Sequence, residues 1–471
     1  MLSGFLEKKI IEHLGIKPTP QQDDLIFDLA EFIVNKENRD IFLLKGYAGT
    51  GKTTVISALV NALAEFKTDT ILLAPTGRAA KVFSNTAKSP AYTIHKKIFR
   101  AKSKNSAITK FTLDYNKHKN AVFIIDESSM ISNDSRDKVV FGTGRLLDDL
   151  MKYVFSGTNC KIIFSGDTAQ LPPVKMDISP ALDKNTLELY GFEVQEYELT
   201  EVVRQSLDSG ILFNATRLRE MISERRTNVF PKFKLDGFND IIRISGTDLI
   251  ETISSAYDGV GLENTIVVTR SNKRANKYNQ GIRQTILYKE SQISREDLVM
   301  VVKNNYYWKD EYDQVDFIAN GDIVHISNIK GFEEMYDYHF AKAEIFMPDY
   351  DAFLDVKLLI ETLDLEAPSL SYDQYKEFFD KVSESYEDEK DRNKRFELIL
   401  GDKHLNALQV KFAYAVTCHK AQGGQWHSVF IDQSYINQDM LNIDFLRWLY
   451  TAITRATDKV YLVNFKDDFF E

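Results

Sequence analysis

The sequence predicts an α/β protein with two parallel-sheet units, a small hairpin insert in the first unit and a β-barrel-containing insert in the second. Three observations support this prediction. Short apolar runs followed by turns recur early in the chain, as in IFLLKG (41–46) and AVFIIDE (121–127). The same pattern returns later, as in TIVVT (265–269) and KVYLVNF (459–465). Between these later runs, residues 296–408 do not show this pattern of apolar runs followed by turns, and they are too many for a loop within a compact domain.

The early runs are expected to be parallel strands that crossover helices bury on both faces, because they are continuously apolar. Ile56, Leu59, Val60 and Leu63 fall at helical spacing after the first run, so residues 52–66 should form a helix that packs on the sheet. The remaining apolar runs are TILLAPTG (70–77) and KIIFSGD (161–167) in the first unit and SVFID (428–432) in the second.

Two inserts interrupt these units. Residues 96–119 are polar and predict a hairpin within the first unit. Within residues 296–408, the segment VMVVKNNYYW, the turn signal Asn320-Gly321 and the strand-like DIVHI predict a small β-barrel. Residues 351–400 hold 14 Asp/Glu against 7 Lys/Arg, and we interpret this acidic stretch as a solvated surface.

Length and composition bound the class of protein. A chain of 471 residues with 44% hydrophobic and 27% charged residues predicts two to four globular domains. No apolar run approaches the ~18–20 residues that cross a bilayer, so we expect a cytoplasmic protein without a membrane partner. Cys160 and Cys418 are the two cysteines of the chain; they lack CxxC spacing, which excludes a zinc cluster of cysteines, and they give no disulfide framework. The net charge of −10 excludes indiscriminate adhesion to DNA, so any nucleic-acid contact must be local.

The segment GYAGTGKT (46–53) fits a phosphate-binding loop and stands between an apolar strand and an amphipathic helix, as such a loop must. Its backbone N–H groups and the helix amino terminus would bind phosphates, Lys52 would reach the β- and γ-phosphates, and Thr53 would bind Mg²⁺. The predicted nucleotide-binding residues here are Gly46, Ala48, Gly49, Thr50, Gly51, Lys52, Thr53 and Thr54. ATP and Mg²⁺ are therefore the expected cofactors.

Three further segments carry candidate catalytic residues. Asp126 and Glu127 follow a buried strand, where Asp126 would bind Mg²⁺ and Glu127 would orient and deprotonate the attacking water. Gln170, in GDTAQLPP (166–173), could contact the γ-phosphate or the water. Arg204 and Arg455 could stabilise charge in phosphoryl transfer, although their positions alone favour neither.

Taken together, these segments resemble the superfamily 1B DNA helicases, the Dda/RecD-like branch that moves 5′→3′. The resemblance covers nearly the whole chain in order. Its matches are TPQQ (19–22) with Gln22 at the adenine-reading glutamine, GYAGTGKTT, APTGRAA (74–80), TIH (93–95), Asp126-Glu127, GDTAQLPP, Arg204, the barrel turn NGD (320–322), TCHKAQG (417–423) and YTAITR (450–455).

The resemblance implies two RecA-like P-loop domains that hold ATP between them, with Arg204 and Arg455 facing the γ-phosphate. The first domain would comprise residues 1–95 and 120–205, and residues 96–119 would form a pin. The second would comprise residues 206–295 and 409–471, interrupted by the barrel insert at 296–408. Cleft closure on ATP would then drive movement along single-stranded DNA and unwinding of duplex DNA.

The same resemblance implies DNA contacts on both domains. The predicted residues are Pro75, Thr76, Arg78, Thr93 and His95 on the first domain and Thr417, His419 and Lys420 on the second. Phe111, with Phe99 behind it, is the aromatic candidate in the pin for stacking on the last base pair; packing is its alternative role. The resemblance also implies a monomer in a bacterial or phage-infected cell, which binds single-stranded DNA and duplex junctions and has replication or recombination proteins as partners.

The sequence departs from the family pattern at a few positions. Gln425 stands where RecD-like proteins often carry glutamate, and Thr168 follows Gly-Asp in place of the usual aspartate or proline. Two alternatives stay open. One is a 3′→5′ superfamily 1A translocase, and the other is an ATP-regulated factor that binds or loads on single-stranded DNA without unwinding.

Overall fold

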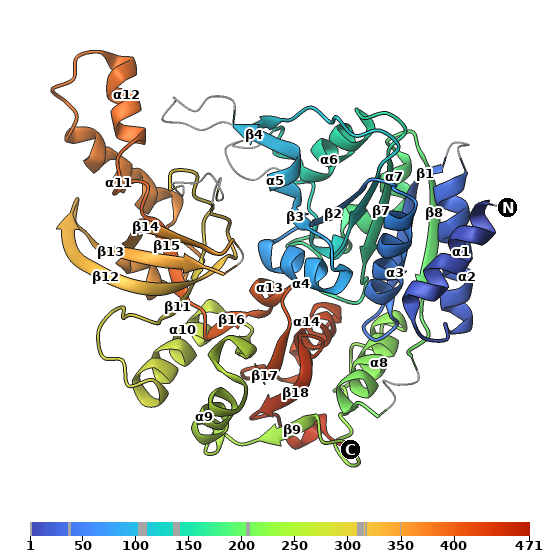
Figure 1. Ribbon diagram of the computed structural model, residues 1–471. Coiled ribbons are helices and arrows are strands. Elements are labelled where there is room, and N and C mark those ends of the chain that lie inside the picture. The colour runs from blue at the N-terminus through green and yellow to red at the C-terminus, as the bar shows by residue number, and fades with distance from the viewer. Residues whose placement is uncertain are drawn as a thin grey trace.

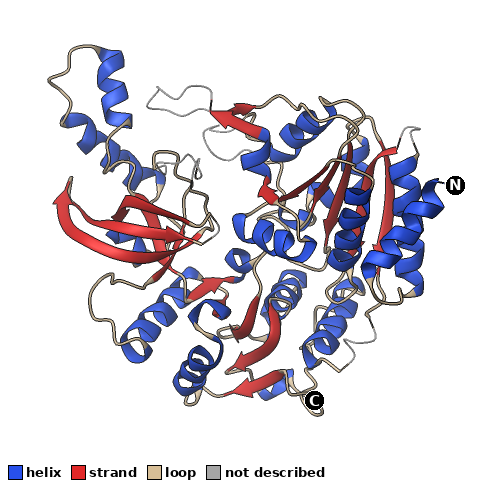
Figure 2. Cartoon of the chain, viewed as in Figure 1, coloured by secondary structure: helices blue, strands red, loops and turns tan. Residues whose placement is uncertain are grey.

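The computed structural model of the protein describes residues 2–35, 39–101, 111–134, 142–203, 208–308, 315, 318–348 and 350–471. Two parallel sheets flanked by helices, a two-stranded hairpin and a closed barrel make up this part of the chain (Figures 1 and 2). The predicted fold class is confirmed. We call the part built on the first sheet the first domain and the part built on the second sheet the second domain.

The first sheet has six strands in the order β3-β2-β6-β7-β1-β8, and every pairing in it is parallel. Its strands are β1 (Arg39–Gly46), β2 (Thr70–Ala74), β3 (Ala91–Thr93), β6 (Val122–Ile125), β7 (Lys161–Gly166) and β8 (Glu193–Leu199). Its helices are α1 (Leu2–Leu14), α2 (Pro20–Val34), α3 (Lys52–Glu65), α4 (Gly77–Ala87), α5 (Ile94–Ile98), α6 (Leu146–Phe155) and α7 (Lys184–Glu188).

Helices cover both faces of this sheet, as its apolar strands predict. In β1, Phe42 and Leu44 pack in a cluster with residues of α1, α2 and α3, whereas Ile41 and Leu43 pack on the opposite face with α5 and α6. Side chains alternate along a strand, so a strand buried on both faces must be apolar at every position. The predicted helix over residues 52–66 is α3, which ends one residue earlier.

The second sheet has five strands in the order β16-β10-β17-β18-β9, again all parallel. Its strands are β9 (Ile241–Ile244), β10 (Thr265–Thr269), β16 (Ala415–Thr417), β17 (Trp426–Asp432) and β18 (Ala456–Val463). Its helices are α8 (Gly210–Ser223), α9 (Leu249–Val260), α10 (Asn272–Gly281), α13 (Cys418–Ala421) and α14 (Ile443–Ile453). In Figure 1, α13 and α14 lie on the side of this sheet that faces the first domain.

A closed barrel stands between β10 and β16 in the chain. Its strands are β11 (Leu298–Val301), β12 (Ile323–Met335), β13 (Tyr338–Met347), β14 (Ala352–Leu359) and β15 (Leu408–Phe412). The acidic stretch divides between β14 and two helices that project beyond the barrel, α11 (Tyr372–Glu384) and α12 (Arg392–Leu400) (Figure 1). Part of it is therefore barrel rather than solvated surface, because β14 alternates buried and exposed side chains before it enters the barrel core.

The hairpin consists of β4 (Phe99–Ala101) and β5 (Phe111–Leu113), which pair antiparallel. Residues 102–110 lie outside the described part of the chain. In the described ranges, none of the helices combines the length and the apolar character that crossing a bilayer requires.

Candidate functional site

The phosphate-binding loop connects β1 to α3. Gly49 and Gly51 have φ angles of 76° and 82°, in the left-handed region that favours glycine, and Gly51 is the residue that caps α3. The Lys52 ammonium folds back on the loop and donates to the carbonyl oxygens of Gly46 at 2.6 Å and Tyr47 at 3.1 Å. The loop thus presents its N–H groups and a lysine at the amino terminus of a helix, which favours anion binding.

A cavity of about 360 Å³ opens in front of this loop, and residues of both domains line it. From the loop, its lining residues include Ala48, Gly49, Gly51, Lys52, Thr53 and Thr54. Asp126, Glu127 and Gln170 line it from the segments that follow β6 and β7, and Gln425 and Arg455 line it from the second domain. Most of the predicted nucleotide and catalytic residues therefore share one cleft between the sheets.

Asp126 and Glu127, two of the carboxylate residues that line this cleft, are partly desolvated. The Ser165 hydroxyl donates to Asp126 at 3.0 Å. Burial raises the pKa of Asp126 and the pKa of Glu127, and the neighbouring positive charge of Arg455 lowers the pKa of Glu127. Glu127 has a φ of 51°, a left-handed conformation that is strained for a residue with a side chain and is typical of functional sites.

Arg455 reaches the cleft from the end of α14. Its side chain is 4% exposed, and one guanidinium nitrogen lies 3.8 Å from a Glu127 carboxylate oxygen. Its Nε donates to the carbonyl oxygen of Thr451 at 3.1 Å and another nitrogen donates to that of Gly424 at 3.3 Å, so the charge has a defined place. Arg204, the other predicted arginine, lies outside the described residues.

Gln170 is 7% exposed and its side-chain oxygen has no hydrogen-bond partner within the described residues. A buried amide oxygen without a partner is uncommon, and this residue lines the cleft. Its position fits the predicted contact with a phosphate or a water.

Three predicted nucleotide-binding residues do not line the cleft. Gly46 lies at the end of β1, and the Thr50 hydroxyl donates to the carbonyl oxygen of Tyr47 at 2.8 Å. Gln22 is 2% exposed; its amide nitrogen donates to the Thr50 carbonyl oxygen at 3.0 Å and its amide oxygen accepts from the Thr19 N–H at 3.1 Å. In this arrangement Gln22 supports the loop from behind.

Sequence reasoning gave no role to Asp167 or Tyr450, which the structure joins at the cleft. The Tyr450 hydroxyl donates to Asp167 at 2.7 Å and accepts from the Ala48 N–H at 2.9 Å. Both residues stand inside quoted motifs, but their contact joins positions 283 apart in the chain, and the local pattern carries no signal for it.

Predicted DNA-contact residues of the first domain lie at the carboxyl ends of β2 and β3. Pro75 and Thr76 follow β2 and are half-buried, and the Thr76 hydroxyl accepts from the Ala79 N–H as the cap of α4. The Thr93 hydroxyl caps α5 in the same way and is buried. Burial lowers the pKa of His95 to about 4, so near neutral pH this imidazole offers a hydrogen bond and no positive charge.

The corresponding residues of the second domain lie at the end of β16, where Thr417 pairs in register with Thr269. Thr417 is half-buried and His419 is exposed. The Lys420 ammonium donates to the side-chain oxygen of Asn320 in the barrel turn. Burial lowers the pKa of Lys420 to about 8, with a further lowering from the charge of Lys411.

Arg78 bridges the two domains. Its guanidinium carbon lies 3.8 Å from the centroid of the Trp426 ring, and it donates to the Gln425 carbonyl oxygen at 3.1 Å. Gly423 approaches the first domain beside it, where a Cβ atom would lie 2.9 Å from that of Ala79. The edges predicted to contact DNA therefore meet each other at this point.

The predicted role of Phe111 as the residue of the pin that stacks on the last base pair is corrected by its position in the structure. It is 6% exposed in the core of the first domain, and its ring centroid lies 5.0 Å from that of Tyr306. Phe99 is similarly buried. A ring enclosed in a core cannot stack on a terminal base pair, so packing, the alternative role, is the one that the structure supports.

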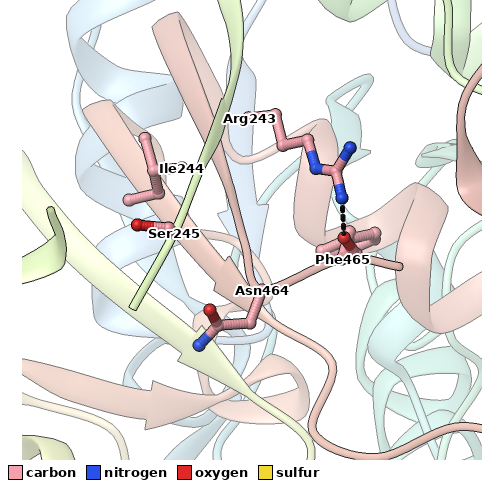
Figure 3. A pocket seen from close by; sticks show the side chains of 5 residues that line it. All are labelled: Arg243, Ile244, Ser245, Asn464 and Phe465. Atoms are coloured by element: carbon pink, nitrogen blue, oxygen red, sulfur yellow. Dashed lines mark hydrogen bonds between the residues drawn. The ribbon is translucent and has the colours of Figure 1, made fainter. Parts of the chain in front are cut away.

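A second cavity lies where β9 and β18 end (Figure 3). Arg243 lines this cavity, and its guanidinium donates to the carbonyl oxygen of Phe465 at 2.9 Å, as Figure 3 shows, and to an Asp467 carboxylate oxygen at 2.7 Å. Because its charge is already paired, this cavity lacks the chemistry of the first.

Two family models match the chain. One is described as an AAA domain and matches residues 28–224, and the other is described as a UvrD-like helicase C-terminal domain and matches residues 412–463. Together they span more than half of the chain.

Individual proteins match over nearly the full length. An uncharacterized protein of Acanthamoeba polyphaga mimivirus is 25% identical over 516 residues, which cover 92% of this chain and 97% of that protein. The ATP-dependent DNA helicase dda of Enterobacteria phage T4 is 26% identical over 449 residues, which cover 91% of this chain and 95% of the helicase. A solved structure of Pif1 helicase from Bacteroides, in complex with ADP-AlF3 and ssDNA, matches at 15% identity with a TM-score of 0.47, over 97% of this chain and 95% of that one.

Proposed function

We propose that the chain is a Dda-like DNA helicase of superfamily 1B, which translocates 5′→3′ on single-stranded DNA and unwinds duplex DNA by hydrolysing ATP. One observation carries the proposal. A single cleft is lined by the phosphate loop and paired carboxyl groups of one domain and by the buried arginine of the other. Hydrolysis in such a cleft is coupled to the relative position of the domains, which is the requirement for a motor.

The first domain supplies the groups that bind the phosphates. Loop N–H groups and Lys52 bind the β- and γ-phosphates, and Lys52 exchanges its present carbonyl partners for phosphate oxygens. Thr53 and Asp126 both line the cleft and offer a hydroxyl and a carboxylate, the oxygen ligands that Mg²⁺ prefers. When bound there, Mg²⁺ would neutralise phosphate charge.

Glu127 and Gln170 act on the attacking water. The raised pKa of Glu127 makes its carboxylate a stronger base than an exposed glutamate, provided that it stays ionised. Arg455 helps to keep it ionised and faces the same space, where it stabilises the charge that develops on the transferred phosphoryl group. Arg204 is the proposed second arginine.

Movement along DNA follows from the edges that flank the cleft. Pro75, Thr76, Thr93 and His95 on one domain and Thr417, His419 and Lys420 on the other are the proposed strand contacts. Contacts of this kind engage the backbone and read little sequence. Arg78 of the first domain contacts Trp426 of the second domain between these two edges. A movement of one domain relative to the other, driven by the nucleotide in the cleft, would therefore change the spacing between the two sets of contacts.

The proposal is tested with duplexes that carry one single-stranded tail, either 5′ or 3′, with ATP hydrolysis followed in parallel. We expect unwinding of the 5′-tailed duplex only, together with ATPase activity stimulated by single-stranded DNA. Lys52→Ala is the matched control because it removes the phosphate-binding ammonium and leaves the DNA edges intact.

The two alternatives are separate outcomes of this experiment. Unwinding from the 3′ tail would indicate a superfamily 1A polarity and overturn the proposed direction. DNA binding without ATP turnover would indicate a loading factor and overturn the proposed motor.

A further inference from the structure

Tyr450 connects three segments at the boundary between the domains. It belongs to α14 of the second domain and is 1% exposed. Its hydroxyl accepts from the Ala48 N–H in the phosphate loop at 2.9 Å and donates to Asp167 after β7 at 2.7 Å. Both partners belong to the first domain, so one phenol oxygen joins the second domain to two sides of the nucleotide cleft.

The surrounding contacts give this phenol a defined position. The other Asp167 oxygen accepts from the Ala169 N–H at 2.9 Å, which orients the carboxylate. The next residue of α14, Thr451, accepts from the Leu171 N–H at 2.9 Å. The end of α14 is therefore bonded to the segment that contains Gln170.

The same helix end carries Arg455. The Arg455 Nε donates to the Thr451 carbonyl oxygen at 3.1 Å, so the guanidinium is held by the turn that follows Tyr450. The distance between Arg455 and Glu127 depends on how α14 sits against the first domain. The phosphate loop itself is also held from within the first domain, by Gln22 and by the Val203 N–H, which donates to the Gly49 carbonyl oxygen at 3.0 Å.

We propose that Tyr450 is a positioning residue that sets the register of the second domain against the phosphate loop and so places Arg455 for hydrolysis. This inference rests on the proposed ATPase function of the cleft. It assigns to Tyr450 an effect on turnover that exceeds its effect on nucleotide binding, because the loop keeps its own supports when the phenol oxygen is removed.

Tyr450→Phe tests this role, because it removes the hydroxyl and keeps the buried ring. Tyr414→Phe is a matched control. Tyr414 is also 1% exposed, donates to Asp297 at 2.8 Å and accepts from the Leu298 N–H at 3.2 Å, but all of these groups lie away from the cleft. Both variants lose the same kind of bonds, so their thermal stabilities should fall by similar amounts.

For Tyr450→Phe we expect a fall of about tenfold in the DNA-stimulated kcat, the size of one buried hydrogen bond, with KM for ATP changed less than about threefold. Tyr414→Phe should leave both constants near the wild-type values. In an Arg455→Lys background, Tyr450→Phe should lower kcat by less than about twofold, because residues that act as one unit are not additive. An undiminished kcat in Tyr450→Phe, or a full additional loss in the Arg455→Lys background, would overturn the inference.

Amide hydrogen exchange gives a readout that does not depend on activity. The peptide spanning residues 46–52 should exchange faster in Tyr450→Phe than in the wild type, and at the wild-type rate in Tyr414→Phe, because the Ala48 N–H loses its acceptor only in the first variant. Unchanged exchange in Tyr450→Phe would contradict the contact itself. A wild-type protein without ATP turnover would instead refute the proposed function, and the exchange measurement would still test the contact.

Discussion

Replacing Arg455 by alanine tests the chemistry of the cleft most sharply. Arg455 is buried, lies 3.8 Å from Glu127 and lines the cavity from the second domain. Arg455→Ala removes this positive charge and leaves the phosphate loop and Lys52 in place. We therefore expect ATP binding to survive and turnover to be lost.

We calculate the size of the loss for a guanidinium that lies as close to the developing charge as Arg455 lies to Glu127, which is 3.8 Å. A guanidinium at about 4 Å from a developing unit charge is worth about 4 kcal/mol at an effective dielectric constant near 20. That energy corresponds to about a thousandfold in rate, at the lower end of the range for arginines that stabilise phosphoryl transfer. Arg455 also lowers the pKa of Glu127, so its removal raises that pKa and moves the acid limb of the rate profile to higher pH.

The assay is steady-state ATP hydrolysis with saturating single-stranded DNA across a pH series, with nucleotide affinity measured separately by a fluorescent analogue. Arg455→Lys is the control, because it keeps a positive charge but lacks the planar guanidinium with its several hydrogen-bond donors. This variant should lose less activity than Arg455→Ala. A rate within tenfold of the wild type in Arg455→Ala, or an unshifted acid limb, would refute the assigned role.

Further predictions follow from single contacts. Lys52→Ala should abolish ATP hydrolysis without lowering the melting temperature, since its bonds are to loop carbonyl groups; a residual wild-type rate would contradict this. Phe111→Ala should lower the free energy of unfolding by about 3–5 kcal/mol in denaturant titrations and reduce unwinding and ATPase together, whereas selective loss of unwinding would restore the pin role. Gly423→Ala should destabilise the protein by about 1–3 kcal/mol, because its φ is 72° and the added Cβ meets Ala79; an unchanged unfolding midpoint would argue against this packing. DNA affinity should fall as pH rises through about 8, where Lys420 loses its charge, and Lys420→Met should flatten that dependence in binding titrations; an equal slope in both proteins would exclude Lys420.

The sequence was most informative where structure is local. The phosphate loop, the helix after it and the buried strands each follow from residue types within about a dozen positions, since spacing alone determines which side chains face the sheet. Two strands of the first sheet were missed for physical reasons. β3 has three residues, and β8 is an edge strand whose alternating polar pattern, EVQEYEL, differs from the apolar runs.

Contacts between the domains could not be predicted from spacing. Ala48 and Tyr450 are 402 positions apart in the chain, and Arg78 and Gln425 are 347 positions apart. Both contacts therefore depend on how the two folded domains pack against each other. Phe111 shows the same limit in a smaller element. An aromatic residue in a short strand fits both a buried and an exposed place, and Tyr306, which follows β11 and packs against Phe111, is distant in the sequence.

The most direct test of a nucleotide-driven change between the domains is a distance measured across them by single-molecule fluorescence transfer. Cys160 and Cys418 are buried, and burial raises the pKa of both thiols, so labels should react at Leu189→Cys and Tyr288→Cys, which replace side chains 87% and 83% exposed in the first and second domains. We expect ADP with aluminium fluoride to shift the transfer efficiency to a second value in the otherwise wild-type protein, and to have no such effect with Lys52→Ala. A single unchanged efficiency at saturating nucleotide would contradict a motor that works by moving its two domains.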